Sequence, residues 1–147
     1  MKKTIFAMIF ILIFLSGCSS SPDKDDVGEY GTPKVESLLV AMNSGDYEGF
    51  SKDFGPLMEE ALTEEVFNGI IKTQIVDVIG AYQEGSLELV KTTEESHNGK
   101  NYISAIYKGQ FELEEGEVAV TVWFTDDEDR KVETLVFNSP KLARENG

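Results

Sequence analysis

The sequence predicts an α+β fold, in which N-terminal helices pack on one face of a curved antiparallel sheet. Three observations predict it. Between residues 33 and 80 the apolar residues recur at the three- and four-residue spacing of amphipathic helices. Between residues 102 and 137 they alternate with polar residues, which is the period of a strand. The pair Asn98-Gly99 is a strong signal for a β-hairpin.

The first two helices have clear boundaries. Thr32-Pro33 supplies a hydroxyl cap followed by proline at the first helical position, and Gly45 ends that helix. Asp46 then caps a short second helix, which Gly55-Pro56 breaks.

A third helix begins after the cap Thr63 and ends at Gly80. We expect Ile70 and Ile71 both to lie in the core, where they would join this helix to Val120 and Val122 of the sheet. The whole apolar face of the helix is formed by Val66, Phe67, Ile70, Ile71, Ile75, Val78 and Ile79.

Four strands follow and form a meander. The first covers residues 87–96, and the Asn98-Gly99 turn leads into a second strand that alternates over residues 103–113. The third covers residues 118–124. After the acidic turn Asp126–Asp129, the last strand covers residues 131–137. The chain shows no internal repeat and no second domain.

The first 17 residues are interpreted as a lipoprotein signal peptide. Lys2-Lys3 precedes the apolar run 5–15, which is shorter than the about 20 residues that a membrane-spanning helix needs. The run ends in Leu15-Ser16-Gly17-Cys18, which resembles a bacterial lipobox. That resemblance implies cleavage before Cys18 and a diacylglyceryl group on its thiol; a plain secretory signal with a chance cysteine is the alternative. The expected location is extracytoplasmic and membrane-anchored, on the outer side of the cell membrane or in the periplasm.

The remaining chain divides into three parts. Residues 18–32 are rich in Ser, Asp, Gly and Pro, which is typical of a flexible tether. Residues 33–140 form the domain, and residues 141–147 form a C-terminal tail. With 13 Lys+Arg against 27 Asp+Glu, the net charge is −14, which argues against nucleic acid as a partner. Such a surface would also be repelled by anionic lipids, so the lipid on Cys18 must supply the attachment to the membrane.

No catalytic residue, cofactor or metal site is expected. One Cys and one His exclude a disulfide framework and a Cys/His zinc site of structural type. His97 lies beside the predicted hairpin turn, where a general base would have neither a cleft nor an orienting partner. The acidic run Asp126–Asp129 lacks the glycine and the ligand spacing of a calcium loop. No acidic residue alternates clearly into the predicted core.

Three segments together resemble a known family. They are residues 38–54 (LLVAMNSGDYEGFSKDF), residues 58–80, and the sheet over residues 102–137, which contains VAVTVWFTDDEDRKVETLVF. This pattern resembles the domain of unknown function 3887 over residues 34–140. That family is similar to the cone-shaped superfamily of nuclear transport factor 2 and ketosteroid isomerase. The resemblance implies a small extracytoplasmic lipoprotein with no established activity. Members often carry glycine where the chain has Asp126–Asp129, so the type of this turn is left open.

In cone-shaped folds of this kind, the resemblance implies a pocket between the sheet and the helices. Tyr47, Tyr82 and Tyr107 would suit its rim, because tyrosine has an apolar body and one polar atom. The alternative is that these rings simply fill the core.

The other face of the sheet is the second candidate. Successive strand residues point to opposite faces, so Trp123 faces outward if Val120 and Val122 meet the helices. Tyr102 and Ile106 would join it, and in folds of this kind that face commonly forms dimers. We therefore expect a homodimer or a protein partner to bind through Trp123, unless the tail 139–147 covers the patch.

The function expected from these observations is non-enzymatic. A lipid-anchored extracytoplasmic domain would bind a small apolar ligand or a protein partner. Two alternatives remain: an isomerase- or dehydratase-like enzyme on the same fold, which would need a buried carboxylate facing a tyrosine, and an accessory subunit of a membrane complex.

Overall fold

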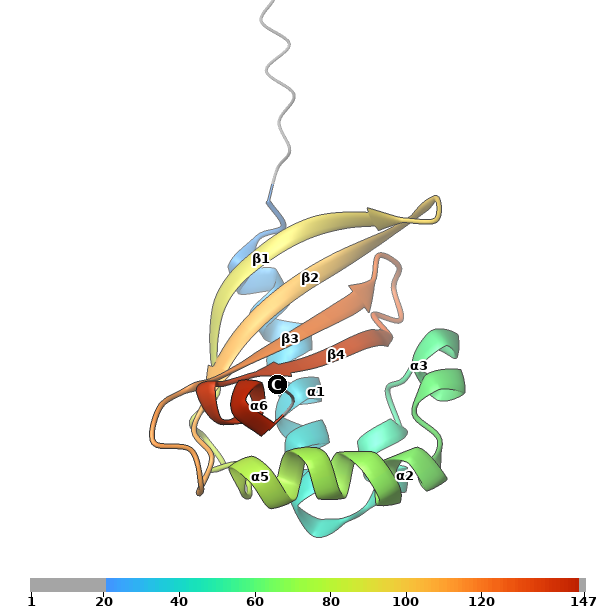
Figure 1. Cartoon of the computed structure of the whole chain (residues 1–147). Coiled ribbons are helices and arrows are strands. Elements are labelled where there is room, and N and C mark those ends of the chain that lie inside the picture. The colour runs from blue at the N-terminus through green and yellow to red at the C-terminus, as the bar shows by residue number, and fades with distance from the viewer. Residues whose placement is uncertain (1–20, 146–147) are drawn as a thin grey trace, which may run out of the picture.

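The computed structural model describes residues 21–145, so the signal segment and Cys18 lie outside the described residues. The helices come first and the sheet follows, which confirms the α+β class (Figure 1). The elements are α1 (Lys24–Ser44), α2 (Tyr47–Ser51), α3 (Pro56–Ala61), α4 (Glu64–Val66), the π-helix η1 (Phe67–Val76), α5 (Asp77–Ile79), β1 (Glu88–His97), β2 (Lys100–Gly109), β3 (Val118–Thr125), β4 (Val132–Asn138) and α6 (Pro140–Glu145). Within residues 21–145, no helix combines the length and the apolar character that crossing a membrane requires.

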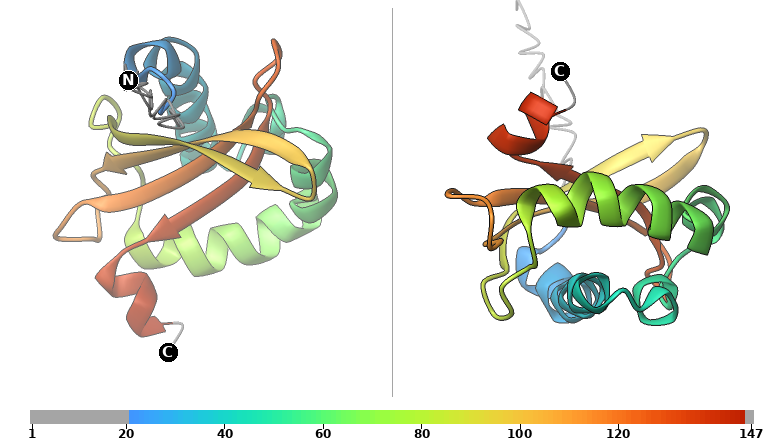
Figure 2. Two further views of the ribbon diagram at one scale, coloured as in Figure 1. Left: turned by 90° about the horizontal axis from the view of Figure 1, so that it is seen from above. Right: turned by 60° about the horizontal axis from the view of Figure 1, so that its bottom comes forward.

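The four strands form one antiparallel sheet in the order β1-β2-β3-β4. The β1–β2 hairpin turns at Asn98 and Gly99, whose φ angles of 51° and 76° are both left-handed, as the Asn-Gly signal predicts. Strand β3 alternates strictly between buried and partly exposed residues, so it has one core face and one outer face. Figure 2 shows α1 on one side of the curved sheet. The helical rod formed by α4, η1 and α5 crosses below the sheet in the view of Figure 1.

Helix α1 begins at Lys24, nine residues before the expected start at Pro33, so residues 24–32 belong to the fold and not to a tether. The side chain of Asp23 caps the helix by accepting a hydrogen bond from the amide of Asp25. Val27 is only 2% exposed. The start of α1 is mostly polar, but one side of it is buried and carries Val27, Gly31 and Val35. The burial of these residues outweighs the free-energy cost of Pro33 inside the helix.

Two contacts fix the start of α1 against the sheet. The hydroxyl of Thr92 in β1 donates to the carbonyl of Pro22 at 2.8 Å. Gly31 faces β2 and β3 so closely that a Cβ atom there would lie 2.6 Å from the Tyr107 hydroxyl and 3.1 Å from the Phe124 ring. Gly31 is therefore needed for close packing, although in the sequence it looked like a linker residue.

The third predicted helix is present, but its middle is a π-helix. Ile71 is buried at 8% exposure, as are Val120 and Val122 at 0%, whereas Ile70 is 46% exposed. The expectation that Ile70 lies in the core is therefore wrong. A π-helix pairs residue i with i+5 and has a wider turn, so the residue three positions after Phe67 no longer returns to the same side.

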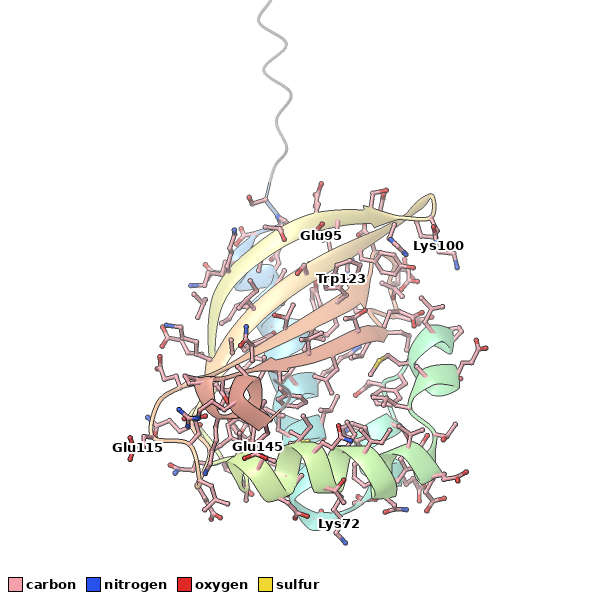
Figure 3. All side chains as sticks on the ribbon, viewed as in Figure 1. Lys72, Glu95, Lys100, Glu115, Trp123 and Glu145 are labelled. Carbon is pink, nitrogen blue, oxygen red and sulfur yellow. The ribbon has the colours of Figure 1, made fainter. Side chains whose placement is uncertain are left out.

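The C-terminal segment is ordered as well. Residues 140–145 form α6, where a C-terminal tail outside the domain was expected from residue 141. Leu142 is 3% exposed and joins the hydrophobic core, and the amide of Lys141 donates to a carboxylate oxygen of Glu114 at 3.1 Å. Helix α6 thus packs at the end of the core, and Figure 3 shows it well away from Trp123.

Candidate functional site

Of the three tyrosines expected at an interior pocket, Tyr82 and Tyr107 lie in the core, and the partly buried Tyr47 packs against it. The Tyr47 hydroxyl donates to the Leu62 carbonyl at 2.8 Å. The Tyr82 hydroxyl donates to a carboxylate oxygen of Glu36 at 2.6 Å. Tyr107 is fully buried. The two hydroxyls that have partners hold loops to helices, and the pockets described below are lined by other residues.

Burial keeps the two deepest of these tyrosines protonated. It raises the pKa of Tyr82 to about 12, with a further contribution from the hydrogen bond to Glu36. Burial also raises the pKa of Tyr107 to about 12. Among the described residues, the Tyr107 hydroxyl has no hydrogen-bond partner, and it lies against Gly31.

The outer face of the sheet brings the other predicted residues together. Tyr102, Ile106 and Trp123 share this face, because Ser104, between Tyr102 and Ile106 on β2, pairs directly with Trp123 on β3. The rings of Tyr102 and Trp123 pack with their centroids 5.7 Å apart. Val136 of β4 lies on the same face and is 50% exposed. Sequence reasoning missed Val136, although its alternation in the last strand signals it.

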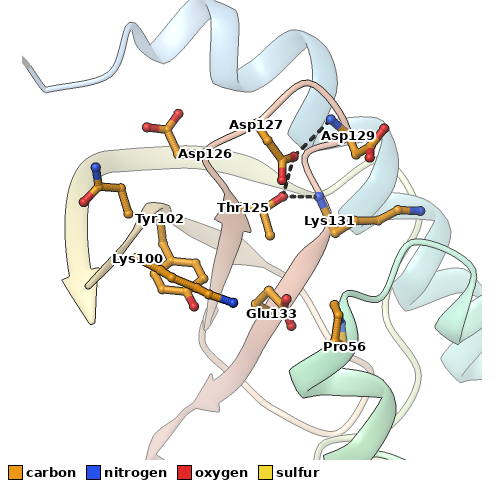
Figure 4. Close-up of a pocket in the computed structure, with 10 residues that line it drawn as sticks. Pro56, Lys100, Tyr102, Thr125, Asp126, Asp127, Asp129, Lys131 and Glu133 are labelled. Atoms are coloured by element: carbon orange, nitrogen blue, oxygen red, sulfur yellow. Dashed lines mark hydrogen bonds between the residues drawn. The ribbon is translucent and has the colours of Figure 1, made fainter. Parts of the chain in front are cut away.

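A pocket of about 520 Å³ opens beside Tyr102 at the end of this face (Figure 4). It lies between the start of β2, the β3–β4 turn and the start of α3. Its lining residues are mostly polar: Pro56, Lys100, Asn101, Tyr102, Thr125, Asp126, Asp127, Asp129, Lys131 and Glu133.

Glu133 is the residue of this pocket that the sequence did not reveal. Trp123 pairs with Thr134 and Phe124 pairs with Val132, so Glu133 is the extra residue of a β-bulge. Its side chain is 9% exposed, and one carboxylate oxygen accepts hydrogen bonds from the amides of Leu57 at 2.9 Å and Met58 at 3.3 Å.

Glu133 thereby satisfies amide groups at the start of α3 and joins this helix to the sheet. Gly55 lies so close to it that a Cβ atom at that position would displace the Glu133 carboxylate. A bulge breaks the alternation of a strand, so inspection of the period could not place this carboxylate in a buried position.

The acidic turn is held together by its own carboxylates. One oxygen of Asp127 accepts hydrogen bonds from the Thr125 hydroxyl and from the amides of Asp129 and Arg130. These bonds lower the pKa of Asp127, and the bond from the Thr125 hydroxyl contributes most. Asp126 forms an ion pair with Arg130 at 2.8 Å.

In residues 21–145, no three His, Cys, Asp or Glu side chains are grouped so that they could hold a metal ion. His97 is exposed at the hairpin.

The free polar groups of the pocket determine what it can do chemically. Lys100 and Lys131 form no ion pair with any described residue. Tyr102 is 5% exposed, and its hydroxyl makes no hydrogen bond to the described part of the chain. Figure 4 shows Lys100 directed toward Glu133, whereas the Lys131 side chain extends away from Tyr102 and Glu133. The pocket thus offers one ammonium group and a hydroxyl next to carboxylates, which suits a polar surface carrying both signs of charge.

The comparisons with known proteins identify a family but no activity. No curated protein and no solved structure matches the chain. The family described as "Protein of unknown function (DUF3887)" matches residues 35–135, which is more than half of the chain and spans α1 from Val35 through most of β4. The chain therefore belongs to the DUF3887 family.

Proposed function

We propose that this protein is a non-enzymatic, lipid-anchored extracytoplasmic domain that binds a protein partner through the outer face of its sheet. The lipid would be attached to Cys18, as the lipobox-like segment indicates. The curved sheet packed on helices is also the arrangement expected of the nuclear transport factor 2-like superfamily, to which we assign the fold. The observation that carries the proposal is the packed pair of Tyr102 and Trp123 beside an open polar pocket.

A protein partner suits this face better than a small ligand does. Trp and Tyr are the side chains that most often carry binding energy at protein interfaces. Ile106 and the half-exposed Val136 extend the apolar area, and the pocket supplies a polar rim at one end. By contrast, the tyrosines expected to line an interior ligand pocket are engaged in packing, which reduces the support for a small apolar ligand inside the cone.

The charge of the chain bears on which partner binds. Two copies that meet face to face would each carry a net charge of −14, counted over the whole sequence. Like charges disfavour such a contact, whereas a partner with basic residues near the acidic turn would be attracted. We therefore favour a different protein, such as a subunit of a membrane complex, over a homodimer.

A second candidate function is an isomerase- or dehydratase-like enzyme, and one observation favours it. Glu133 and Tyr102 are both nearly buried and line the same pocket, so a carboxylate and a tyrosine hydroxyl do occur together. However, two backbone amides already bind one oxygen of Glu133, so the carboxylate has an evident structural role in capping α3.

Site-specific photo-crosslinking in native membranes tests the proposed function. A photoreactive amino acid replaces Val136 on the outer face or, as a control of matched exposure, Leu113, which is 53% exposed on a loop elsewhere. We expect a discrete protein adduct at position 136 and none at position 113, and the adduct's mass shows whether the partner is another protein or a second copy. Equal labelling at both positions, or none at 136, would contradict partner binding through this face.

A further inference from the structure

The π-helix η1 is unusual in its length. Helices of this type are rare, appear mostly as single-turn bulges, and are frequent at functional sites. Here the π-helix covers 10 residues, Phe67–Val76, in the middle of the rod that crosses beneath the sheet. Figure 3 shows Lys72 of this stretch at the opposite end of the molecule from Lys100, which lines the Tyr102 pocket, so the outer-face site does not account for it.

A small cavity of about 150 Å³ lies between this π-helix and the C-terminal end of α1. One wall is apolar and consists of Met42 of α1 and Phe67, Ile71 and Val76 of η1. The open side is lined by Asn43, Ser44, Gly45 and Lys72. Met42 and Phe67 are 2% exposed, so the inner wall belongs to the core. Lys72 lies at the rim, and Figure 3 shows its ammonium group pointing away from the molecule.

The wide register of η1 builds this cavity. Two pairs of its lining residues, Phe67 with Lys72 and Ile71 with Val76, are five positions apart, which is the spacing of successive turns in a π-helix. In an α-helix, Ile70 would lie on the same side as Phe67 and Ile71. In the structure Ile70 is 46% exposed, so its side chain points into solvent and does not fill the cavity beside Phe67 and Ile71.

We propose that this cavity is a binding site for one uncharged aromatic or branched aliphatic group of about the size of benzene. A cavity of ~150 Å³ lined by apolar side chains is known to accept benzene. A bound group of that size contacts Met42 and Phe67 and stabilises the π register, because it fills space that the α register closes. The site is distinct from the outer face of the sheet and does not depend on partner binding there.

Nuclear magnetic resonance of the full-length protein in detergent micelles, with methyl-labelled methionine and benzene as the probe, tests the proposal. We expect a saturable shift of the Met42 methyl signal and nuclear Overhauser contacts from benzene to that methyl group. The methyl group of Met58, which is buried at 5% exposure in α3 and does not line the cavity, is the internal reference. Val76→Phe, which places a ring in the cavity, should abolish the Met42 shift, whereas Ile70→Ala should preserve it.

Three results would overturn the proposal. They are no saturable shift of Met42, equal shifts at Met42 and Met58, and an undiminished Met42 shift in folded Val76→Phe. The Overhauser contacts are measured on the unmodified protein, so the test holds even if Val76→Phe fails to fold.

Discussion

Replacing Cys18 with serine is expected to move the protein from the membrane fraction to the soluble fraction. The serine hydroxyl cannot take the place of the thiol that a lipobox modifies. Residues 21–145 offer no anchor of comparable strength, because no helix in this range can span a membrane and the net charge of the chain, −14, repels anionic lipids. The change should be nearly complete, since loss of two or more acyl chains removes the main source of membrane affinity.

Fractionation of cells that express either form measures this effect. Ser19→Ala, which changes the neighbouring hydroxyl and leaves the cysteine in place, is the matched control and should remain in the membrane fraction. Retention of the Cys18→Ser protein at the control level would show that the lipobox interpretation is wrong.

The second large effect is expected from adjacent isoleucines of the π-helix. Ile71→Ala should lower the free energy of unfolding by about 2–5 kcal/mol, because Ile71 is 8% exposed and packs in the core. Ile70→Ala removes the same atoms from a side chain that is 46% exposed, and should change the stability by only about 0.5 kcal/mol.

Urea unfolding of both variants in the Cys18→Ser background compares them directly. The neighbouring positions share helix propensity and chain context, so the difference between them reports burial alone. Equal losses for the two variants would mean that the helix has an α register, in which both side chains face the core.

Much of the fold could be predicted from the sequence, because local signals and burial agree. The Asn98-Gly99 turn, the cap at Thr63 and the alternation of β3 all correspond to features of the structure. The first part of α1 was missed because its one apolar stripe is interrupted by acidic residues and glycines. Its stability comes from packing against β1 and β2, a tertiary effect that composition does not reveal.

The candidate site was predictable only in part. The period of two places Trp123, Tyr102 and Ile106 on one face, and the structure brings them together there. Glu133 could not be found in this way, because the bulge in β4 breaks the period at that residue. Ile70 was misplaced for the analogous reason in a helix, since the spacing used to assign it is that of an α-helix and not of a π-helix.

The most direct test of the account is the effect of Trp123→Ala on the adduct formed from position 136 in native membranes. If Trp123 anchors the partner, its truncation should cost at least about 2 kcal/mol of binding, or roughly 30-fold in affinity, and the adduct should fall to the level of the position-113 control. Lys108→Ala, which removes an exposed charge from the same face, should leave the adduct in place. An undiminished adduct in a folded Trp123→Ala protein would contradict the claim that the outer face of the sheet is the binding surface.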